Sequence, residues 1–199
     1  MTSRRHALAR AGLCLALAVL VATTASAQAP APRAQAPVLV TSCGQSPGPV
    51  KITVFLKQLQ IDHEYKAEAT AKDLAGKKFK SLIIVTGASL KGMGAAGISI
   101  KDELSRTAAL IAEARKLGIP LIGSHVEGME RRAQGASPGD NSDELSIDAV
   151  CPKAQFMIVR KDGDEDGRFS TISKQARIPL ILFEKNLELR DVLKNVYGK

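Results

Sequence analysis

Apolar and polar residues alternate along this chain with two distinct periods. Residues 81–86, SLIIVT, form a short β-branched run of the kind found in strands that are buried on both faces, as parallel strands are. After a glycine-rich stretch, Ser99 and Asp102 form a capping-box pattern, apolar residues recur at helical spacing, and Gly118 marks the end. The pattern predicts a strand, a glycine-rich loop and then a long amphipathic helix.

The same alternation of strand and helix continues over the rest of the chain. Further strands are predicted at 38–42, 64–69, 120–125, 155–160 and 179–183, and further helices at 50–60, 144–150, 169–176 and 186–197. Residues 50–60 fit either period, and Ser46 followed by Pro47 favours a helix, because proline is common at the first helical position. Strands alternating with helices predict an α/β fold. We expect a doubly wound, mostly parallel sheet of five or six strands, in a flavodoxin-like or Rossmann-like three-layer sandwich.

Residues 1–27 have the features of a secretory signal peptide. Three arginines precede the apolar run LCLALAVLVATTA, and Ala25-Ser26-Ala27 offers small residues to signal peptidase. Ser3-Arg4-Arg5 resembles a twin-arginine signal, but the usual aromatic residue and lysine are missing, so Sec export is favoured and Tat is the alternative. Residues 28–37, rich in alanine and proline, are expected to form a flexible tether, and residues 38–199 a single domain. We expect a periplasmic or secreted protein that does not insert into the membrane after cleavage.

Composition narrows the range of partners. The chain of 199 residues has 28 basic and 20 acidic side chains, and removal of the three signal-peptide arginines leaves 25 basic residues and a charge of +5. With this mild charge, no tryptophan and two tyrosines, a nucleic-acid partner is not expected. Cys43 and Cys151 are predicted at opposite ends of parallel strands, about 17 Å apart for five strand residues. Because a disulfide needs Cα atoms within about 7 Å, both thiols are predicted to be free.

The residues of greatest chemical interest follow the predicted strands at their carboxyl ends. Doubly wound sheets bind ligands beyond these ends. Arginines offer planar donors to a carboxylate or phosphate, and amides orient such a ligand. The predicted anion-binding residues are Ser42, Gly44, Gln45, Ser46, Ser89, Lys91, Gly92, Gly94, His125, Arg131 and Arg132. The alternative is that the two arginines are solvated loop residues.

Gly92, Gly94 and Gly97 match the dinucleotide-binding pattern G-x-G-x-x-G. Five residues separate the strand from the first glycine, whereas that pattern begins almost directly after its strand, so NAD is not expected. Two interpretations remain open. The segment is either a crossover loop with a structural role, or a concavity of backbone amides that binds an anion with Lys91 as the cation.

Three sequence blocks resemble the signature of a known family. TSCGQSPG follows the first strand, GASLKGMGAAGI the third and SHVEGMERRAQG the fourth. Together they resemble a family of secreted bacterial proteins classed as a domain of unknown function, over nearly all of residues 38–198. The resemblance implies an exported single α/β domain and names no activity. A small residue such as alanine is expected in that family where Cys43 stands, which places an essential role for this thiol in doubt.

A catalytic alternative depends on His125. Cys43 or Ser42 would act as the nucleophile and His125 as the base, on strand ends expected to be adjacent, in a periplasmic hydrolase or transferase. No G-x-S-x-G sequence surrounds these serines, and a structural histidine is an equal alternative. Zinc is not expected, because His125-x-Glu127 lacks the paired cysteines of the zinc deaminase signature.

A second alternative concerns calcium. Asp162, Asp164 and Asp166 alternate as in the first half of a calcium-binding loop, where carboxylates supply oxygen ligands. The closing glutamate is missing, since position 173 is serine, so a solvated acidic turn is the alternative.

These features lead to one expected function and two alternatives. We expect an exported binding module for a small anionic ligand, which it would deliver to a membrane transporter or present to a sensor. A hydrolase or transferase is the alternative, and a calcium-dependent interaction module is the second alternative.

Overall fold

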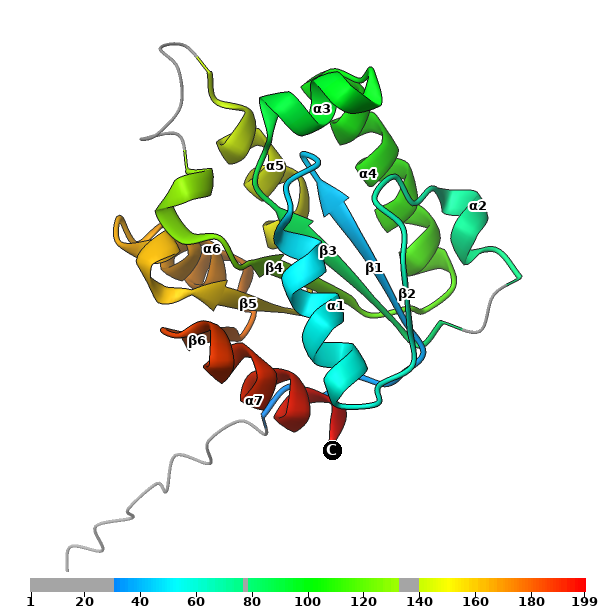
Figure 1. Ribbon diagram of the computed structural model, residues 1–199, viewed down its shortest axis with the longest axis vertical. Helices are drawn as coiled ribbons and strands as arrows, with labels where there is room; N and C mark the ends of the chain where they lie inside the picture. Colours follow the sequence, from blue (N-terminus) through cyan, green and yellow to red (C-terminus); the bar gives the residue numbers. More distant parts are fainter. Residues whose placement is uncertain (1–30, 77–78, 133–139) are drawn as a thin grey trace, which may run out of the picture. The chain divides into compact units, whose positions relative to one another are not determined.

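The computed structural model describes residues 31–76, 79–132 and 140–199, whose apolar runs form a sheet of six parallel strands (Figure 1). The strands are β1 (Val38–Cys43), β2 (His63–Tyr65), β3 (Ser81–Thr86), β4 (Leu121–His125), β5 (Phe156–Arg160) and β6 (Leu180–Phe183). Their order is β2-β1-β3-β4-β5-β6, and every pairing is parallel. β1, β3 and β4 are buried at every residue, as expected for central parallel strands. The predicted α/β class is confirmed.

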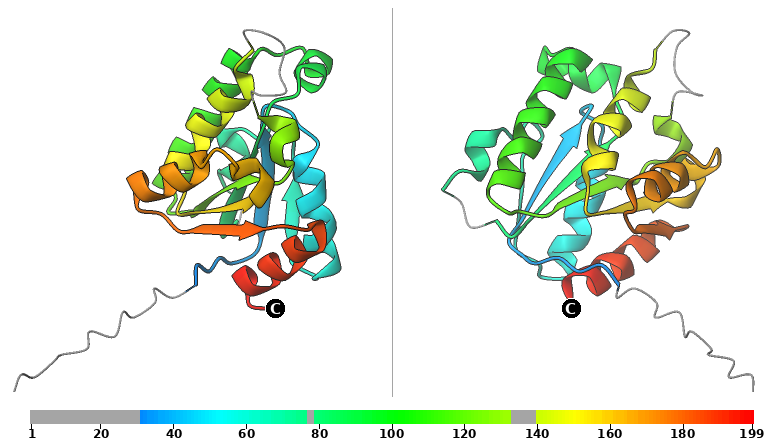
Figure 2. Two further views of the ribbon diagram at one scale, coloured as in Figure 1. Left: turned by 90° about the vertical axis from the view of Figure 1, so that its left-hand side faces the viewer. Right: turned by 180° about the vertical axis from the view of Figure 1, so that it is seen from behind.

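Helices cover both faces of this sheet (Figures 1 and 2). They are α1 (Gly48–Gln58), α2 (Ala71–Leu74), α3 (Leu90–Ala96), α4 (Ile100–Lys116), α5 (Ser142–Val150), α6 (Arg168–Ala176) and α7 (Asn186–Tyr197), with 3-10 turns η1 (Gly128–Arg131), η3 (Cys151–Lys153) and η4 (Lys161–Asp164). α1 and α7 pack on one face, and α2, α4, α5 and α6 on the other. The result is the predicted three-layer sandwich.

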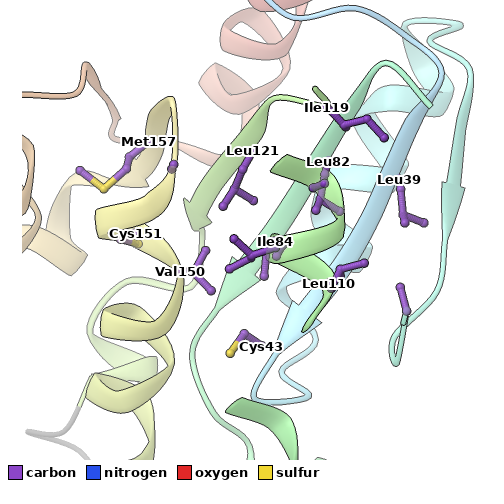
Figure 3. Packing of buried hydrophobic residues seen from close by; sticks show 14 of the residues in the cluster. Leu39, Cys43, Leu82, Ile84, Leu110, Ile119, Leu121, Val150, Cys151 and Met157 are labelled. Carbon is purple, nitrogen blue, oxygen red and sulfur yellow. The ribbon is translucent and has the colours of Figure 1, made fainter. Parts of the chain in front are cut away.

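Alternate residues of each strand supply two separate apolar cores. Leu39, Leu82 and Ile84 point toward α4 and α5, whereas their neighbours Val40 and Ile83 point toward α1 and α7. Figure 3 shows the first core, in which the helices contribute residues such as Leu110 and Val150.

Cys43 and Cys151 are both buried in this first core, and both are free thiols as predicted. The two cysteines were expected at opposite ends of the strands, but Cys151 lies over Gly123 in the middle of β4. A Cβ on Gly123 would lie 3.5 Å from the Cys151 sulfur. Cys151 is therefore in the helical layer and not at the far end of the sheet.

Strand order reverses between β1 and β3. The chain leaves β1 through α1 to reach β2 at one edge, and after β3 it proceeds in the other direction to β6. The C-terminal ends of β1 and β3 therefore flank the switch point at which sheets of this type bind ligands.

The segment before β1 is more ordered than a flexible tether would be. The Ala34 amide donates to the Val196 carbonyl over 3.0 Å, the Ser81 hydroxyl donates to the Gln35 carbonyl over 2.7 Å, and Ala34 is buried. Residues 34–37 thus belong to the domain, whereas the expected signal peptide lies outside the described residues. None of the described helices has both the length and the apolar character needed to cross a membrane.

Candidate functional site

The loops that follow β1 and β3 close the crevice at the switch point. Gln45 and Ala88 form an isolated antiparallel bridge, and the Ser89 amide donates to the Gly44 carbonyl over 2.7 Å. Gly44 has a φ of +112°, and a Cβ there would lie 2.5 Å from the Gly87 carbonyl oxygen. Only glycine allows this approach of two backbones. The loops touch each other where a ligand was expected to lie between them.

Three buried carboxylates accept hydrogen bonds from backbone amides of these loops. Glu103 accepts the Gly44 amide over 2.8 Å, and Glu127 accepts the Gly48 amide over 3.0 Å. Asp143 accepts the Ala88 amide, and burial raises the pKa of its carboxyl group above the usual value. The amide of Gly44, a residue expected to bind an external anion, and the nearby amides of Gly48 and Ala88 are therefore bonded to the protein's own side chains.

Glu103 is also the centre of an ion pair that holds the β1–α1 loop. Its second oxygen accepts from Arg106 Nε over 2.7 Å, and Arg106 in turn donates to the Ser42 carbonyl over 2.6 Å. Gln45 donates to Glu103 over 2.9 Å, which fixes a residue that has a positive φ of 56°. The predicted ligand-binding Gln45 thus has a structural role.

Sequence reasoning missed Glu103, Arg106, Glu127 and Asp143. Glu103 could have been found, because it shares the buried stripe of α4 with Leu110, seven residues later. A carboxylate on an apolar helical stripe needs a buried partner.

The glycine-rich segment is a helix, so the predicted loop is wrong. Ser89 accepts the Gly92 amide over 3.0 Å as the N-cap of α3, which leaves Ser89 occupied, and Gly97 ends the helix with a φ of 68°. The Gly92 amide is thus taken by the Ser89 side chain and Gly94 lies inside α3, so these glycines do not form the predicted concavity of free amides. Lys91 remains exposed in the first turn of this helix.

The two adjacent arginines have different surroundings. Arg132 is 3% exposed, and it donates to Glu144 over 2.8 Å, to Asp166 over 2.6 Å and to the Gly163 carbonyl. These contacts leave it no free face, so the prediction of a ligand-binding Arg132 is wrong.

Arg131 keeps 29% of its side chain exposed, and its hydrogen bonds to other described residues are long. Its Nε lies 3.3 Å from Glu127 Oε1, and its Nη1 lies 3.5 Å from the Ala88 carbonyl. Gly87, with a φ of +115°, packs directly against the Arg131 stem.

His125 is fully buried and has a partner at each ring nitrogen. Nε2 lies 2.9 Å from the Gly128 carbonyl, Nδ1 lies 3.3 Å from the Thr86 hydroxyl, and the ring is 5.1 Å from that of Phe169. Burial lowers the pKa of the imidazole, so the neutral form with a proton on Nε2 fits these contacts. His125 has the role of a structural histidine.

Neither predicted nucleophile meets His125. Ser42 shares the α1 side of the sheet with Val38 and Val40, whereas His125 packs on Phe169 on the opposite side. Cys43 is on the same side as His125, but β3 separates β1 from β4, so their backbones are about 9.5 Å apart. Burial also raises the pKa of the Cys43 thiol to about 11. The expectation that the two strand ends are adjacent is wrong.

The two serines of the first block are both buried. Ser46 accepts the Gly48 amide over 3.3 Å. The Ser42 hydroxyl has no partner among the described residues.

The three aspartates of the acidic turn point to three different partners. Asp162 pairs with Arg160 at 2.6 Å, Asp166 pairs with Arg132, and Asp164 accepts the Phe169 amide over 2.6 Å at the start of α6. The part of the chain that the structure describes contains no cluster of three metal-ligating side chains. The three aspartates that were predicted to bind calcium therefore bind arginines and a backbone amide of the protein instead.

A family model described as a domain of unknown function, DUF6305, matches residues 35–197. The chain belongs to this family. In this DUF6305 domain the first two sequence blocks meet at the Gln45–Ala88 bridge, and the third block supplies His125, Glu127 and Arg131 beside it. The family resemblance predicted from these blocks is confirmed.

No curated protein matches this DUF6305 domain. Among solved structures, it is similar to the psychrotrophic esterase EstA from Pseudoalteromonas sp., with 10% identity, a TM-score of 0.34, and coverage of 80% of this chain and 94% of that one. It is also similar to AlinE4, an SGNH-hydrolase family esterase, with 11% identity, a TM-score of 0.29 and coverage of 76% of each chain. Scores this low carry no functional inference.

Proposed function

We propose that this DUF6305 protein is exported and binds a small anionic molecule, a carboxylate or a phosphate, through Arg131 and Lys91. The contrast between the two arginines carries the proposal. Arg132 is saturated within the fold, whereas Arg131 is partly exposed and its Nη2 group has no hydrogen-bond partner among the described residues. A guanidinium has five N–H donors in a planar fork that matches carboxylate and phosphate groups.

An internal carboxylate supports the choice of ligand chemistry. Glu127 lies between Arg131, at 3.3 Å, and the amide of Gly48 at the N-terminus of α1, at 3.0 Å. Pro47 gives α1 no side-chain cap, so Glu127 supplies the negative charge that a helix N-terminus favours. An external anion would bind the exposed side of Arg131 and compete with Glu127 for it.

Lys91 would provide the second positive charge. It lies three residues after Ala88, whose carbonyl contacts Arg131, and its side chain is exposed. A catalytic function is not proposed, because Ser42, Cys43 and His125 form no nucleophile–base pair.

Export rests on the signal-peptide features of residues 1–27. Mass spectrometry of the protein purified from the periplasm tests this part directly. A mature N-terminus at Gln28 is expected, and an intact Met1 in the cytoplasmic fraction would contradict it.

The binding proposal is tested with inorganic phosphate as the probe. The melting temperature would be followed by circular dichroism in phosphate and in sodium chloride of equal ionic strength. At a phosphate concentration ten times the dissociation constant, we expect stabilisation of about 1.4 kcal/mol, or a rise of roughly 3–6 °C for a domain of this size.

Three variants make the test specific. Arg131→Gln should abolish the rise, and Glu127→Gln should enlarge it by removing the competing carboxylate. Arg190→Gln, at an exposed arginine of α7, is the matched control and should keep the rise. A rise that survives Arg131→Gln, or no rise in the wild-type protein with either phosphate or acetate, would overturn the proposal.

A further inference from the structure

A cavity of about 580 Å³ lies at the N-terminal ends of the strands. Arg131 lies at the opposite, C-terminal ends. Three segments form its walls: the arm that precedes β1, the start of β3, and the turn between α4 and β4. Figure 2 shows the arm passing along this edge of the sheet beside α7.

The lining of the cavity combines apolar side chains with polar groups. Phe79, Ile119 and Ala34 line it, and each is 8–9% exposed, while Leu117 at the rim is 44% exposed. The volume falls within the range of about 300–1,000 Å³ that is typical of small-molecule sites.

Two cations flank these apolar side chains. Arg33 and Lys80 both line the cavity and are both exposed. Within residues 31–76, 79–132 and 140–199, neither forms an ion pair, and the Arg33 guanidinium donates only to the Asn195 carbonyl. The backbone next to each cation is fixed, since the Ala34 amide is bonded to α7 and the Lys80 amide donates to the Pro37 carbonyl over 2.8 Å. The two cations therefore extend from a fixed backbone, and no carboxylate of the described residues pairs with either.

We propose that this cavity is a second binding site, which takes an amphipathic carboxylate. The apolar part of the ligand would lie against Phe79, Ile119 and Leu117, and its carboxylate would lie between Arg33 and Lys80. Apolar surface provides the affinity, and the cations select the charge and orient the ligand. β3, with six residues, separates the two edges by about 20 Å, so this site does not depend on the anion site at Arg131.

The probe for this site is 4-phenylbutyrate, and its neutral analogue 4-phenylbutanol is the charge control. Amide chemical shifts of the isotope-labelled protein would be recorded during titration. We expect saturable shifts at Ala34, Lys80 and Ile119, a dissociation constant on the order of 1 mM, and binding of the alcohol roughly tenfold weaker.

Paired variants separate charge from apolar contact. Arg33→Gln with Lys80→Gln should weaken binding about tenfold, whereas Lys174→Gln with Arg190→Gln, at exposed cations of α6 and α7, should leave it unchanged. Leu117→Ser should weaken binding about threefold, and Leu187→Ser, at a leucine that is 74% exposed elsewhere, should not.

The pattern of shifts decides the result. Absence of saturable shifts, or equal effects of the test and control variants, would overturn the proposal. Shifts confined to Gly87, Ala88 and Arg131 would also overturn it, and would leave the separate anion site intact.

Discussion

His125 should make the stability of the fold depend on pH between 7 and 5. Its imidazole is fully buried, and burial is the main cause of its lowered pKa, with the nearby Arg132 charge acting in the same direction. The bond to the Gly128 carbonyl and the Glu127 carboxylate oppose this shift only in part. In the unfolded chain the imidazole pKa returns to about 6.5.

The sign and the size of the effect follow from proton linkage. A lowered pKa in the folded state means that the unfolded chain takes up the proton first as the pH falls. The stability that neutral His125 contributes is therefore fully present above about pH 6.5 and is lost below it. If the folded protein stays unprotonated to pH 5, the loss between pH 7 and pH 5 is about 1.9 kcal/mol. For a domain of this size, that corresponds to a fall in melting temperature of roughly 4–8 °C.

Urea unfolding followed by far-ultraviolet circular dichroism measures this loss, since the chain has no tryptophan. The free energy of unfolding would be compared at pH 7, 6 and 5 in the wild type, in His125→Gln and in His63→Gln as a matched control. Asp143, whose raised pKa acts in the opposite direction, is present in all three proteins and cancels in the comparison. The same pH dependence in wild type and His125→Gln would refute the reasoning.

Three further predictions test the closed C-terminal edge. Arg132→Met should destabilise the fold by about 2–3 kcal/mol in urea unfolding, which is below the cost for a fully buried pair because Glu144 and Asp166 are 21% and 36% exposed. Arg131→Met should destabilise it by less than about 1 kcal/mol, and equal losses for the two variants would contradict the assigned roles. Gly44→Ala should lose at least 2 kcal/mol, because of its φ of +112° and the contact of 2.5 Å with Gly87, whereas Gly94→Ala in open space within α3 should gain up to about 1 kcal/mol in thermal unfolding. In a Cys14→Ser background, Cys43 and Cys151 should resist a thiol reagent in the native state and react in denaturant, since burial raises the pKa of both thiols; rapid native labelling would disprove their burial.

The fold could be predicted because its signals are local. β1 and β3 at the centre are apolar runs rich in β-branched residues, and Ser99 with Asp102 marks the start of α4 as a capping box that the structure contains. Local signals also explain why a loop was wrongly predicted for the glycine-rich segment. Glycine has a poor helix propensity, but the Ser89 cap and the packing of Met93, which is 4% exposed, hold α3 in a helix.

The candidate site could be located only in part. The three sequence blocks do meet at the switch point, yet whether a charged side chain there is free depends on partners far away in the sequence. Glu103 is 59 positions from Gly44, and Glu127 is 79 positions from Gly48. Nothing in the pair Arg131-Arg132 tells which arginine is saturated, because Glu144 and Asp166 are brought to Arg132 by the folding of α5 and the acidic turn.

The exclusively parallel sheet also constrains how the chain reaches its fold. Its closest strand pairing along the chain joins Met157 to Leu180, and the pairing of Val38 with Ser81 spans 43 positions. No hairpin exists among these six strands, so no pair of strands can form from one tight turn. Each pairing must close a long loop before it gains its contacts, which predicts slow folding, in milliseconds to seconds, from a nucleus of distant segments. A chain that emerges from a membrane pore N-terminus first would leave β1 with only the three residues of β2 to pair with until β3 had followed it through.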